Sequence, residues 1–244
     1  MDLMLIRSRY KITQVLHVGT DYAAFLAVDI ESREKTECLL NVYEGALGRQ
    51  YASLFGRLQH CPEYESMFLS NGALVTVFAY RQAVDIDSVF YKGANVTWQM
   101  RLQYAQLLFH LALSVSDFPS EIACAAFLTK NLKILRTDMK LAVNYIIPPI
   151  PGTNSRELIY MLTDQIRKVL IRRFEQSHAE RAFLNELESG VFTSVAPLYS
   201  HWQTVLREIT AEYERVYALS AVLRTWHFIT GYFSKFRKKQ KRRK

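Results

Sequence analysis

The residue types most often used in catalysis are scattered along this chain of 244 residues. No two histidines have H-x-x-x-H spacing, no carboxylate stands at ligand spacing from one, and isolated histidines are ordinarily neutral surface or packed groups. Neither a G-x-S-x-G motif nor a Walker phosphate loop is present. We therefore expect no metal site and no catalytic triad. The six histidines are His17, His60, His110, His178, His201 and His227.

The three cysteines, Cys38, Cys61 and Cys124, lie far apart and form no C-x-x-C pair. This usage favours a reducing compartment and argues against a zinc site or a disulfide framework. The apolar start Met1–Ile6 is followed, not preceded, by basic residues, which is unlike a signal peptide. The sequence contains no run of about 18 apolar residues, the length that a membrane-spanning helix needs. We expect a cytoplasmic protein.

The net charge of +8 is concentrated at one end of the sequence. The last ten residues, KFRKKQKRRK, contain eight lysines or arginines and no acid. Without these eight, the 31 basic residues fall to 23, which equals the number of acidic residues. The body of the chain is therefore formally neutral, and a strongly basic tail follows it.

The elements that would position any site begin with strands. Apolar or alternating runs cover residues 9–18, 22–30 and 36–44, and two more, 66–70 and 73–80, flank an Asn-Gly turn. A helical pattern over 47–60 lies between the third run and the fourth. These patterns predict a small α+β unit of five strands with one helix.

The second part of the chain reads as mainly helical. Thr97 can cap a helix over 97–117, and two short strand-like runs, 132–135 and 140–147, end at a proline-rich joint. Three helical patterns follow, opening at residue 154 or 155, at 178 and at 194. We expect the last to continue as one long helix to about Phe236.

The order of these elements, and several stretches within them, resemble a protein kinase domain of the bacterial Ser/Thr type. RYKITQVLHVG resembles the first kinase strand, AFLAVD the second, and LFGRLQHCPEYESMFLSNGALVTVFAY the stretch from the helix to the hinge. The resemblance covers residues 9–146. It implies an α+β, two-lobed kinase-like fold, with a five-stranded antiparallel N-lobe and a mainly helical C-lobe. The implied divisions are an N-lobe 1–84, a C-lobe 85–200, a long C-terminal helix 201–234 and a basic tail 235–244.

The nucleotide-binding groups of the family are replaced at the matching positions. The three glycines of the phosphate loop correspond to His17, Gly19 and Tyr22, so one glycine of three is kept. The strand lysine corresponds to Asn41, and its partner carboxylate on the helix corresponds to Tyr51. We expect the ring of Tyr22 to lie where the phosphates would bind.

The resemblance places the catalytic loop on AFLTKNLK. The base aspartate then corresponds to Leu128, the metal-binding asparagine to Lys133, and the D-F-G aspartate falls near Asn144. Phosphoryl transfer depends on positioned charges and metal-binding groups, and all of them are missing here. We therefore expect a pseudokinase without enzyme activity, cofactor or small-molecule substrate, which acts as a regulatory or protein-interaction scaffold.

The C-terminal region suggests a membrane surface as a further partner. Ile209, Val216 and Leu223 recur every seven residues, which is typical of a seam that could also support self-association. Aromatic residues followed by a cationic run are typical of contact with anionic lipid, which predicts a peripheral or juxtamembrane location at the inner face of the cell membrane. The residues predicted to contact membrane are Trp226, Phe233, Lys235, Arg237, Lys238, Lys239, Lys241, Arg242, Arg243 and Lys244.

Two alternatives remain open at this stage. The basic run is also compatible with binding nucleic acid through its phosphates, or with a solubilising tail. The whole chain could instead be a non-kinase α+β interaction protein whose tail binds nucleic acid. Topology separates these readings, because the kinase reading requires an antiparallel sheet over residues 9–80 with the helix 47–60 against it.

Overall fold

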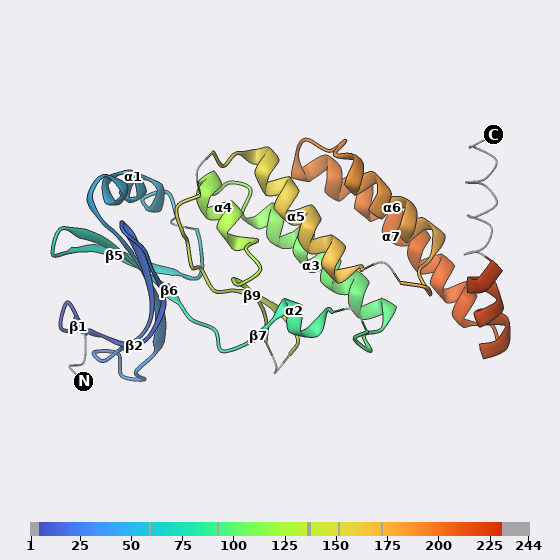
Figure 1. Cartoon of the computed structure of the whole chain (residues 1–244), viewed down its shortest axis with the longest axis horizontal. Coiled ribbons are helices and arrows are strands. Elements are labelled where there is room, and N and C mark those ends of the chain that lie inside the picture. The colour runs from blue at the N-terminus through green and yellow to red at the C-terminus, as the bar shows by residue number, and fades with distance from the viewer. Residues whose placement is uncertain are drawn as a thin grey trace. The chain divides into compact units, whose positions relative to one another are not determined.

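The computed structural model describes residues 5–58, 60–91, 93–135, 138–150, 152–171 and 173–230 (Figure 1). The chain forms two compact units. The first comprises the described residues of Met1–Val89 and Leu111–Met161, and the second those of Phe90–His110 and Leu162–Lys244. Helices α3 and α5 each contribute residues to both units.

The first unit contains an antiparallel sheet of six strands in the order β1-β2-β3-β4-β6-β5. The strands are β1 Leu5–Ile6, β2 Tyr10–Val18, β3 Tyr22–Asp29, β4 Glu37–Tyr43, β5 Tyr64–Ser70 and β6 Ala73–Ala79. Five of them were predicted, so the expected five-stranded sheet is short by one. The extra strand β1 has two residues, too few for an alternating pattern, and forms only because a turn at Arg7–Arg9 folds it onto β2.

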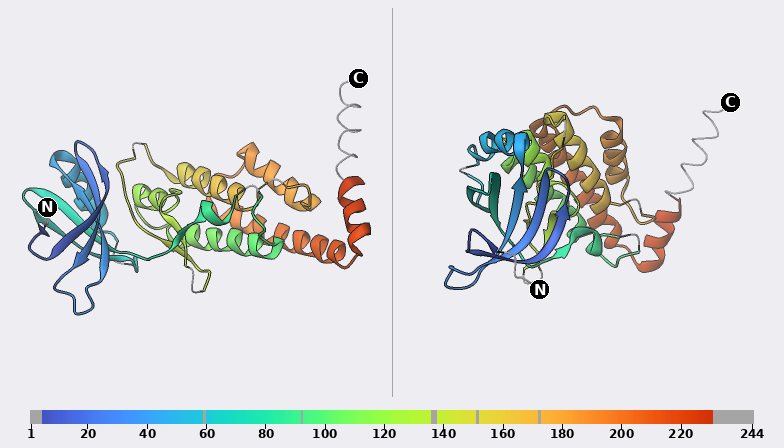
Figure 2. Two further views of the ribbon diagram at one scale, coloured as in Figure 1. Left: turned by 60° about the horizontal axis from the view of Figure 1, so that its bottom comes forward. Right: turned by 60° about the vertical axis from the view of Figure 1, so that its left-hand side comes forward.

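The two faces of this sheet are covered differently, as the alternation along β4 requires. Leu40 faces a hydrophobic cluster that includes Tyr10 and Val77. Tyr43 lies on the other face, which helix α1 (Gly45–Phe55) covers by packing against β4 and β6. Figure 2 shows the twist of this sheet from two further directions. The predicted helix between the third and fourth predicted strands is confirmed.

A second, three-stranded antiparallel sheet completes the first unit. Its order is β7-β8-β9, so the predicted pair of short strands forms a hairpin that β7 extends. Two short helices belong to the same unit. The elements are β7 Val84–Asp85, α2 Ile86–Val89, α4 Ser120–Ala126, β8 Leu132–Ile134 and β9 Leu141–Val143.

The second unit is helical and packs around Trp202, which is fully buried. The ring of Trp202 lies 5.3 Å from that of Phe109 and 5.1 Å from that of Phe183. Ser177 caps α6 by accepting a hydrogen bond from the Glu180 amide at 3.0 Å. The helices are α3 Trp98–Ser114, α5 Ser155–Val169, α6 His178–Ser189 and α7 Val195–Tyr217.

The expected continuous helix over 201–234 is wrong. Helix α7 ends at Tyr217, a break covers residues 218–220, and a second helical segment covers 221–230. The break turns the chain so that Phe228 is buried and its ring lies 6.3 Å from that of Phe174, while the heptad residue Leu223 is 55% exposed. Residues 231–244, with Phe233 and the basic tail, lie outside the described part of the chain. Among the described helices, none has the length and apolarity needed to cross a bilayer.

Candidate functional site

Asn41 is fully buried at the centre of β4 and binds a segment more than 100 residues away in the sequence. Its Oδ1 accepts hydrogen bonds from the Tyr22 hydroxyl and from the Ile147 amide, both at 2.8 Å. Its Nδ2 donates to the carbonyl of Tyr145 at 3.0 Å. Asn41, which the sequence resemblance aligns with the kinase lysine, therefore holds the chain that follows β9.

Two further buried asparagines hold the same segment. Asn131 Nδ2 donates to the carbonyls of Ala125 at 2.7 Å and Ile146 at 2.8 Å. Asn144 Oδ1 accepts from the Arg81 amide at 2.9 Å, and its Nδ2 donates to the Arg81 carbonyl at 3.0 Å. The Asn144 amide itself donates to the Asn131 carbonyl at 2.9 Å. We call Asn41, Asn131 and Asn144 the carboxamide clamp.

The chemistry of the clamp requires carboxamides, because each side chain both donates and accepts. A lysine at Asn41 could not accept from Ile147, and an ionised aspartate at Asn144 could not donate to Arg81. The side chains of Asn41 and Asn131 satisfy backbone groups of residues 145–147, and the side chain of Asn144 satisfies those of Arg81, all without a charge. The clamp therefore fixes the segment after β9 against β4 without any buried charge.

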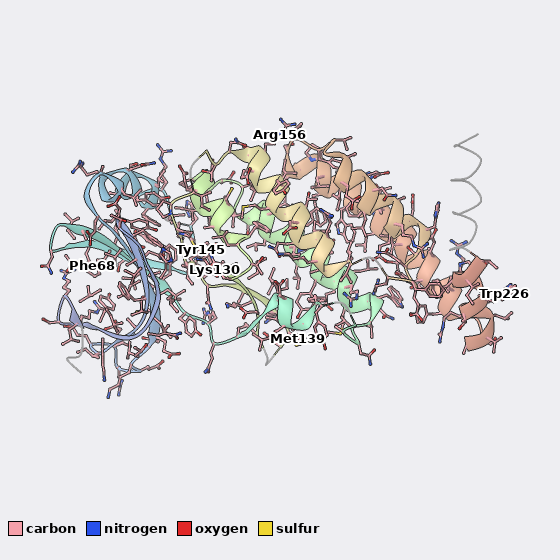
Figure 3. All side chains as sticks on the ribbon, viewed as in Figure 1. Phe68, Lys130, Met139, Tyr145, Arg156 and Trp226 are labelled. Carbon is pink, nitrogen blue, oxygen red and sulfur yellow. The ribbon has the colours of Figure 1, made fainter. Side chains whose placement is uncertain are left out.

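Tyrosine rings line the same region. The Tyr43 hydroxyl donates to the Ile147 carbonyl at 2.8 Å, and its ring stacks on that of Tyr51 at 4.4 Å. The ring of Tyr145, labelled in Figure 3, lies 5.2 Å from that of Phe78 on β6. Burial raises the pKa of Tyr51 to about 12 and raises the pKa values of Tyr22, Tyr43 and Tyr145 well above the ordinary tyrosine value. All four phenols are therefore neutral hydrogen-bonding groups at physiological pH.

The structure brings together four of the residues that the sequence singled out: Tyr22, Asn41, Tyr51 and Asn144. Tyr22 is 5% exposed, and its hydroxyl donates to Asn41. The backbone of Tyr22 is held by the Gly19 amide, which donates to the Tyr22 carbonyl at 2.8 Å. His17 is exposed on β2, with its ring 5.4 Å from that of Tyr22.

The two positions assigned to the catalytic loop lie apart from the clamp contacts. Leu128 is half-buried in the turn after α4, where its carbonyl accepts from the amide of Asn131 at 2.8 Å. The ammonium of Lys133 on β8 forms an ion pair with Asp85. Lys133 thus links the central strand of the small sheet to Asp85 on β7, and it takes no part in the clamp.

Sequence reasoning missed Asn131, although a signal was present. Moving the catalytic-loop register by two residues puts Asn131 on the metal-binding asparagine and Ala126 on the catalytic aspartate. Either register leaves the base position without a carboxylate. In the original register Lys130 matches the loop lysine, and burial lowers its pKa. Among the described residues, no three histidine, cysteine or acidic side chains gather to hold a metal ion.

Comparison with known proteins identifies the type of fold but no family. No family model and no curated protein matches the sequence. The kinase domain of Mycobacterium tuberculosis PknI is similar in structure, with a TM-score of 0.54 and 10% identity over 85% of this chain and 98% of that one. A double mutant of the same domain gives a TM-score of 0.54 and 11% identity over 87% and 98% of the two chains. The kinase-like fold predicted from the sequence is therefore confirmed.

The predicted membrane-contacting residues are described only in part. Trp226 is 64% exposed on the helical segment 221–230 and is labelled in Figure 3. Val222 and Leu223 beside it are also exposed, and this segment lines a shallow apolar hollow of about 490 Å³. The other predicted contacts, Phe233 and the basic residues from Lys235 to Lys244, lie outside the described residues.

Proposed function

We propose that this chain is a kinase-like module without phosphotransfer activity, which acts by binding other proteins. The carboxamide clamp is the observation that supports this proposal. It places residues 144–147 against β4 through buried hydrogen bonds, where an active kinase would hold its lysine and metal-binding aspartate close to the nucleotide. A module that keeps the fold but not this site retains a surface for regulation and assembly.

Binding a nucleotide at this position has a steep energetic cost. The segment 144–147 would have to leave its buried partners, and each buried polar group left unpaired costs about 1–3 kcal/mol. The charges that would compensate are absent, since Asn41 and Asn144 replace the two ionic contacts to phosphate and metal. We therefore expect the clamped form to prevail with or without nucleotide.

The decisive experiment measures thermal stability with magnesium and ATP. Magnesium-ATP at about 100 times a relevant dissociation constant would stabilise a binding protein by about 2.7 kcal/mol. We expect no shift in the unfolding temperature beyond that caused by magnesium alone, and no autophosphorylation with radiolabelled ATP. Asn41→Lys should restore neither property, because the added ammonium cannot accept the bonds from Tyr22 and Ile147.

The matched control is Lys130→Ala, which leaves the clamp intact. Stabilisation of the wild-type protein by magnesium-ATP that disappears in this variant would contradict the proposal. It would identify a divergent nucleotide-binding protein that uses the remaining loop lysine.

We further propose that the module works at the inner face of the cell membrane. The exposed apolar side chains of segment 221–230 support this, together with the basic run that follows in the sequence. Exposed aromatic and aliphatic side chains can enter the headgroup region, and each basic residue near an anionic surface adds about 1 kcal/mol.

Vesicle sedimentation tests the membrane proposal. Binding should require anionic lipid and weaken as salt shortens the screening length toward about 8 Å at physiological ionic strength. Glutamine at Arg237, Lys238, Lys239, Lys241, Arg242 and Arg243 should abolish it without unfolding the neutral body. Trp226→Ala should weaken it, whereas Tyr160→Ala, which removes an equally exposed ring from α5, should not. Tight binding to oligonucleotides without vesicle binding would contradict this proposal and favour the nucleic-acid alternative.

A further inference from the structure

A groove of about 370 Å³ lies beside β5, the strand at one edge of the six-stranded sheet. The β1–β2 turn and β2 form one side, and β5 forms the other. The sides meet where the rings of Tyr10 and Phe68 stack in parallel at 5.6 Å. Figure 3 labels Phe68 on this part of the sheet. The groove is lined by Arg7, Arg9, Tyr10, Glu31, Ser66, Met67 and Phe68, so one acidic side chain, Glu31, stands among them.

Arg7 brings a positive charge to this groove. Its guanidinium lies 5.1 Å from the centre of the Phe68 ring, and no acidic partner of Arg7 occurs within the described residues. Arg9 is different, because Asp29 binds its guanidinium through two hydrogen bonds of 2.9 and 2.6 Å and Glu31 lies 3.6 Å away. Arg7 is therefore the cation available to a ligand.

The backbone at Arg7 is held in an unfavourable conformation. Arg7 and Ser8 both have positive φ values, 53° and 54°, a region that side chains other than glycine and asparagine rarely adopt. Such outliers persist where the surrounding structure imposes them, and they concentrate at functional sites. Here the left-handed turn directs the guanidinium over Phe68 beside the open side of β5.

The free edge of β5 supplies backbone groups to the same groove. The turn Asn71-Gly72 makes Ser70 and Ala73 the closing pair of the hairpin, and such pairs exchange both backbone hydrogen bonds. Alternation along the strand then turns the N–H and C=O groups of Phe68 toward β6. Those of Met67 and Leu69 turn outward, where no further strand of the sheet occurs among the described residues. Leu69 is also 73% exposed.

We propose that this groove binds an extended acidic segment of a partner protein, which adds to the sheet as a strand beside β5. Backbone bonds to Met67 and Leu69 give affinity for any extended chain. A carboxylate of the segment pairs with Arg7 on the face of the sheet that carries Phe68. Its apolar side chains, which alternate with the acidic ones, contact Met67 and Leu69 on the other face. Charge selects the partner, because the available guanidinium disfavours a basic strand at the same edge.

This site deepens the proposed interaction role and rests on it, but its test does not involve the clamp. The probe is a fluorescently labelled peptide of alternating valine and glutamate, about eight residues long to span one strand. Binding is followed by fluorescence anisotropy, and the bound position by amide NMR of the full chain. We expect chemical-shift changes and slowed hydrogen exchange at Met67 and Leu69, with the valine–lysine peptide binding at least about tenfold more weakly.

Two variants separate the two components of binding. Met67→Pro removes an outward N–H and leaves the hydrogen bonds between β5 and β6 in place, so this variant should not bind the peptide. Met67→Ala keeps the N–H and should bind it. Arg7→Asn removes the charge and suits the left-handed turn better than arginine does. It should lower affinity about tenfold, since charge-assisted hydrogen bonds are the stronger ones, without lowering the unfolding temperature.

The proposal is overturned if the valine–glutamate peptide does not bind, if Met67→Pro binds as well as Met67→Ala, or if the lysine peptide binds equally well. It is also overturned if free glutamate or inorganic phosphate, added at the same total negative charge as the peptide, displaces the peptide completely. The groove would then be a simple anion site. If the peptide does not bind, the expected result of the magnesium-ATP experiment is unchanged. If magnesium-ATP stabilises the protein, the expected peptide binding is unchanged. The two proposals therefore fail separately.

Discussion

Each unit of this protein contains a network of buried polar side chains, and the two networks are of opposite kinds. The carboxamide clamp of the first unit is neutral and pairs mainly with backbone groups. The second unit buries an ionic cluster of Arg173, Gln176, Glu180 and Tyr213, in which Glu180 is fully buried. Nη2 of Arg173 lies 3.3 Å from Oε1 of Glu180, and Gln176 donates to the same oxygen at 2.8 Å. The Tyr213 hydroxyl donates to the other carboxylate oxygen of Glu180.

This difference has consequences for stability. A neutral amide network is strong only while every donor and acceptor is paired, but it takes up no protons between pH 4 and 9. A buried ion pair gains little over apolar packing, yet the removal of one partner leaves an uncompensated charge. We therefore expect the clamp to respond to changes in hydrogen-bonding pattern, and the ionic cluster to changes in charge and pH.

The largest effect should come from Glu180→Ala. This change leaves the guanidinium of Arg173 buried without its carboxylate, which should lower the free energy of unfolding by about 3–5 kcal/mol. Asp164→Ala is the control, because it removes an exposed pair with Lys168 that is worth less than about 1 kcal/mol. Urea denaturation compares the two. If Glu180→Ala and Asp164→Ala lower the free energy of unfolding equally, burial of the ionic cluster has no effect on stability.

Asn41→Asp should come next, at about 3 kcal/mol near neutral pH, because a buried carboxylate would face the Tyr145 carbonyl in place of a donor. Burial would raise the pKa of the new carboxyl group. The variant should therefore regain stability as pH falls and the group protonates, which denaturation at several pH values would detect. A loss independent of pH would contradict the close contact of this side chain with the segment after β9.

Glu180 should make wild-type stability depend on pH. Burial raises the pKa of Glu180 above its ordinary value of 4.5, so between that value and the raised one the native state keeps a proton that the unfolded chain has released. This contribution is fully present below the ordinary value and is lost as pH rises through the raised one, by at most about 1.4 kcal/mol per pH unit. The difference in unfolding free energy between wild type and Glu180→Gln measures it. Asn131→Ala, which touches only the clamp, should differ from wild type by the same amount at every pH.

The smallest effect should be a gain. Thr76 lies directly opposite Asn41 in the ladder, and its fully buried hydroxyl has no hydrogen-bond partner among the described residues. Thr76→Val keeps the shape and removes the unpaired group, so it should stabilise the protein by about 1 kcal/mol. Calorimetry of the two proteins is sufficient. A destabilised variant would mean that the hydroxyl has a partner in solution, such as a water molecule shared with the clamp.

The local patterns in the sequence determined much of the fold. Alternation and turn residues gave the strands from β2 to β6, because one face of each strand must be apolar for burial. The prediction that Asn41 stands where kinases carry a lysine also came from the sequence, since it concerns the residue type at one strand position. Both inferences depend on information that lies within a few residues of the site.

Tertiary structure decided what Asn41 does. Its partners at Tyr145 and Ile147 lie more than 100 residues along the chain, and no local pattern reports such a pairing. The role of Asn131 depended on its bond to Ile146 in the same segment. Strand β1 was missed for another reason, because it pairs with the adjacent β2 but is too short to show an alternating pattern. The break after Tyr217 depended on distant contacts too, because the heptad repeat continues through it in the sequence. Periodicity shows which residues can share a face, whereas burial against a distant residue such as Phe174 determines where the helix must turn.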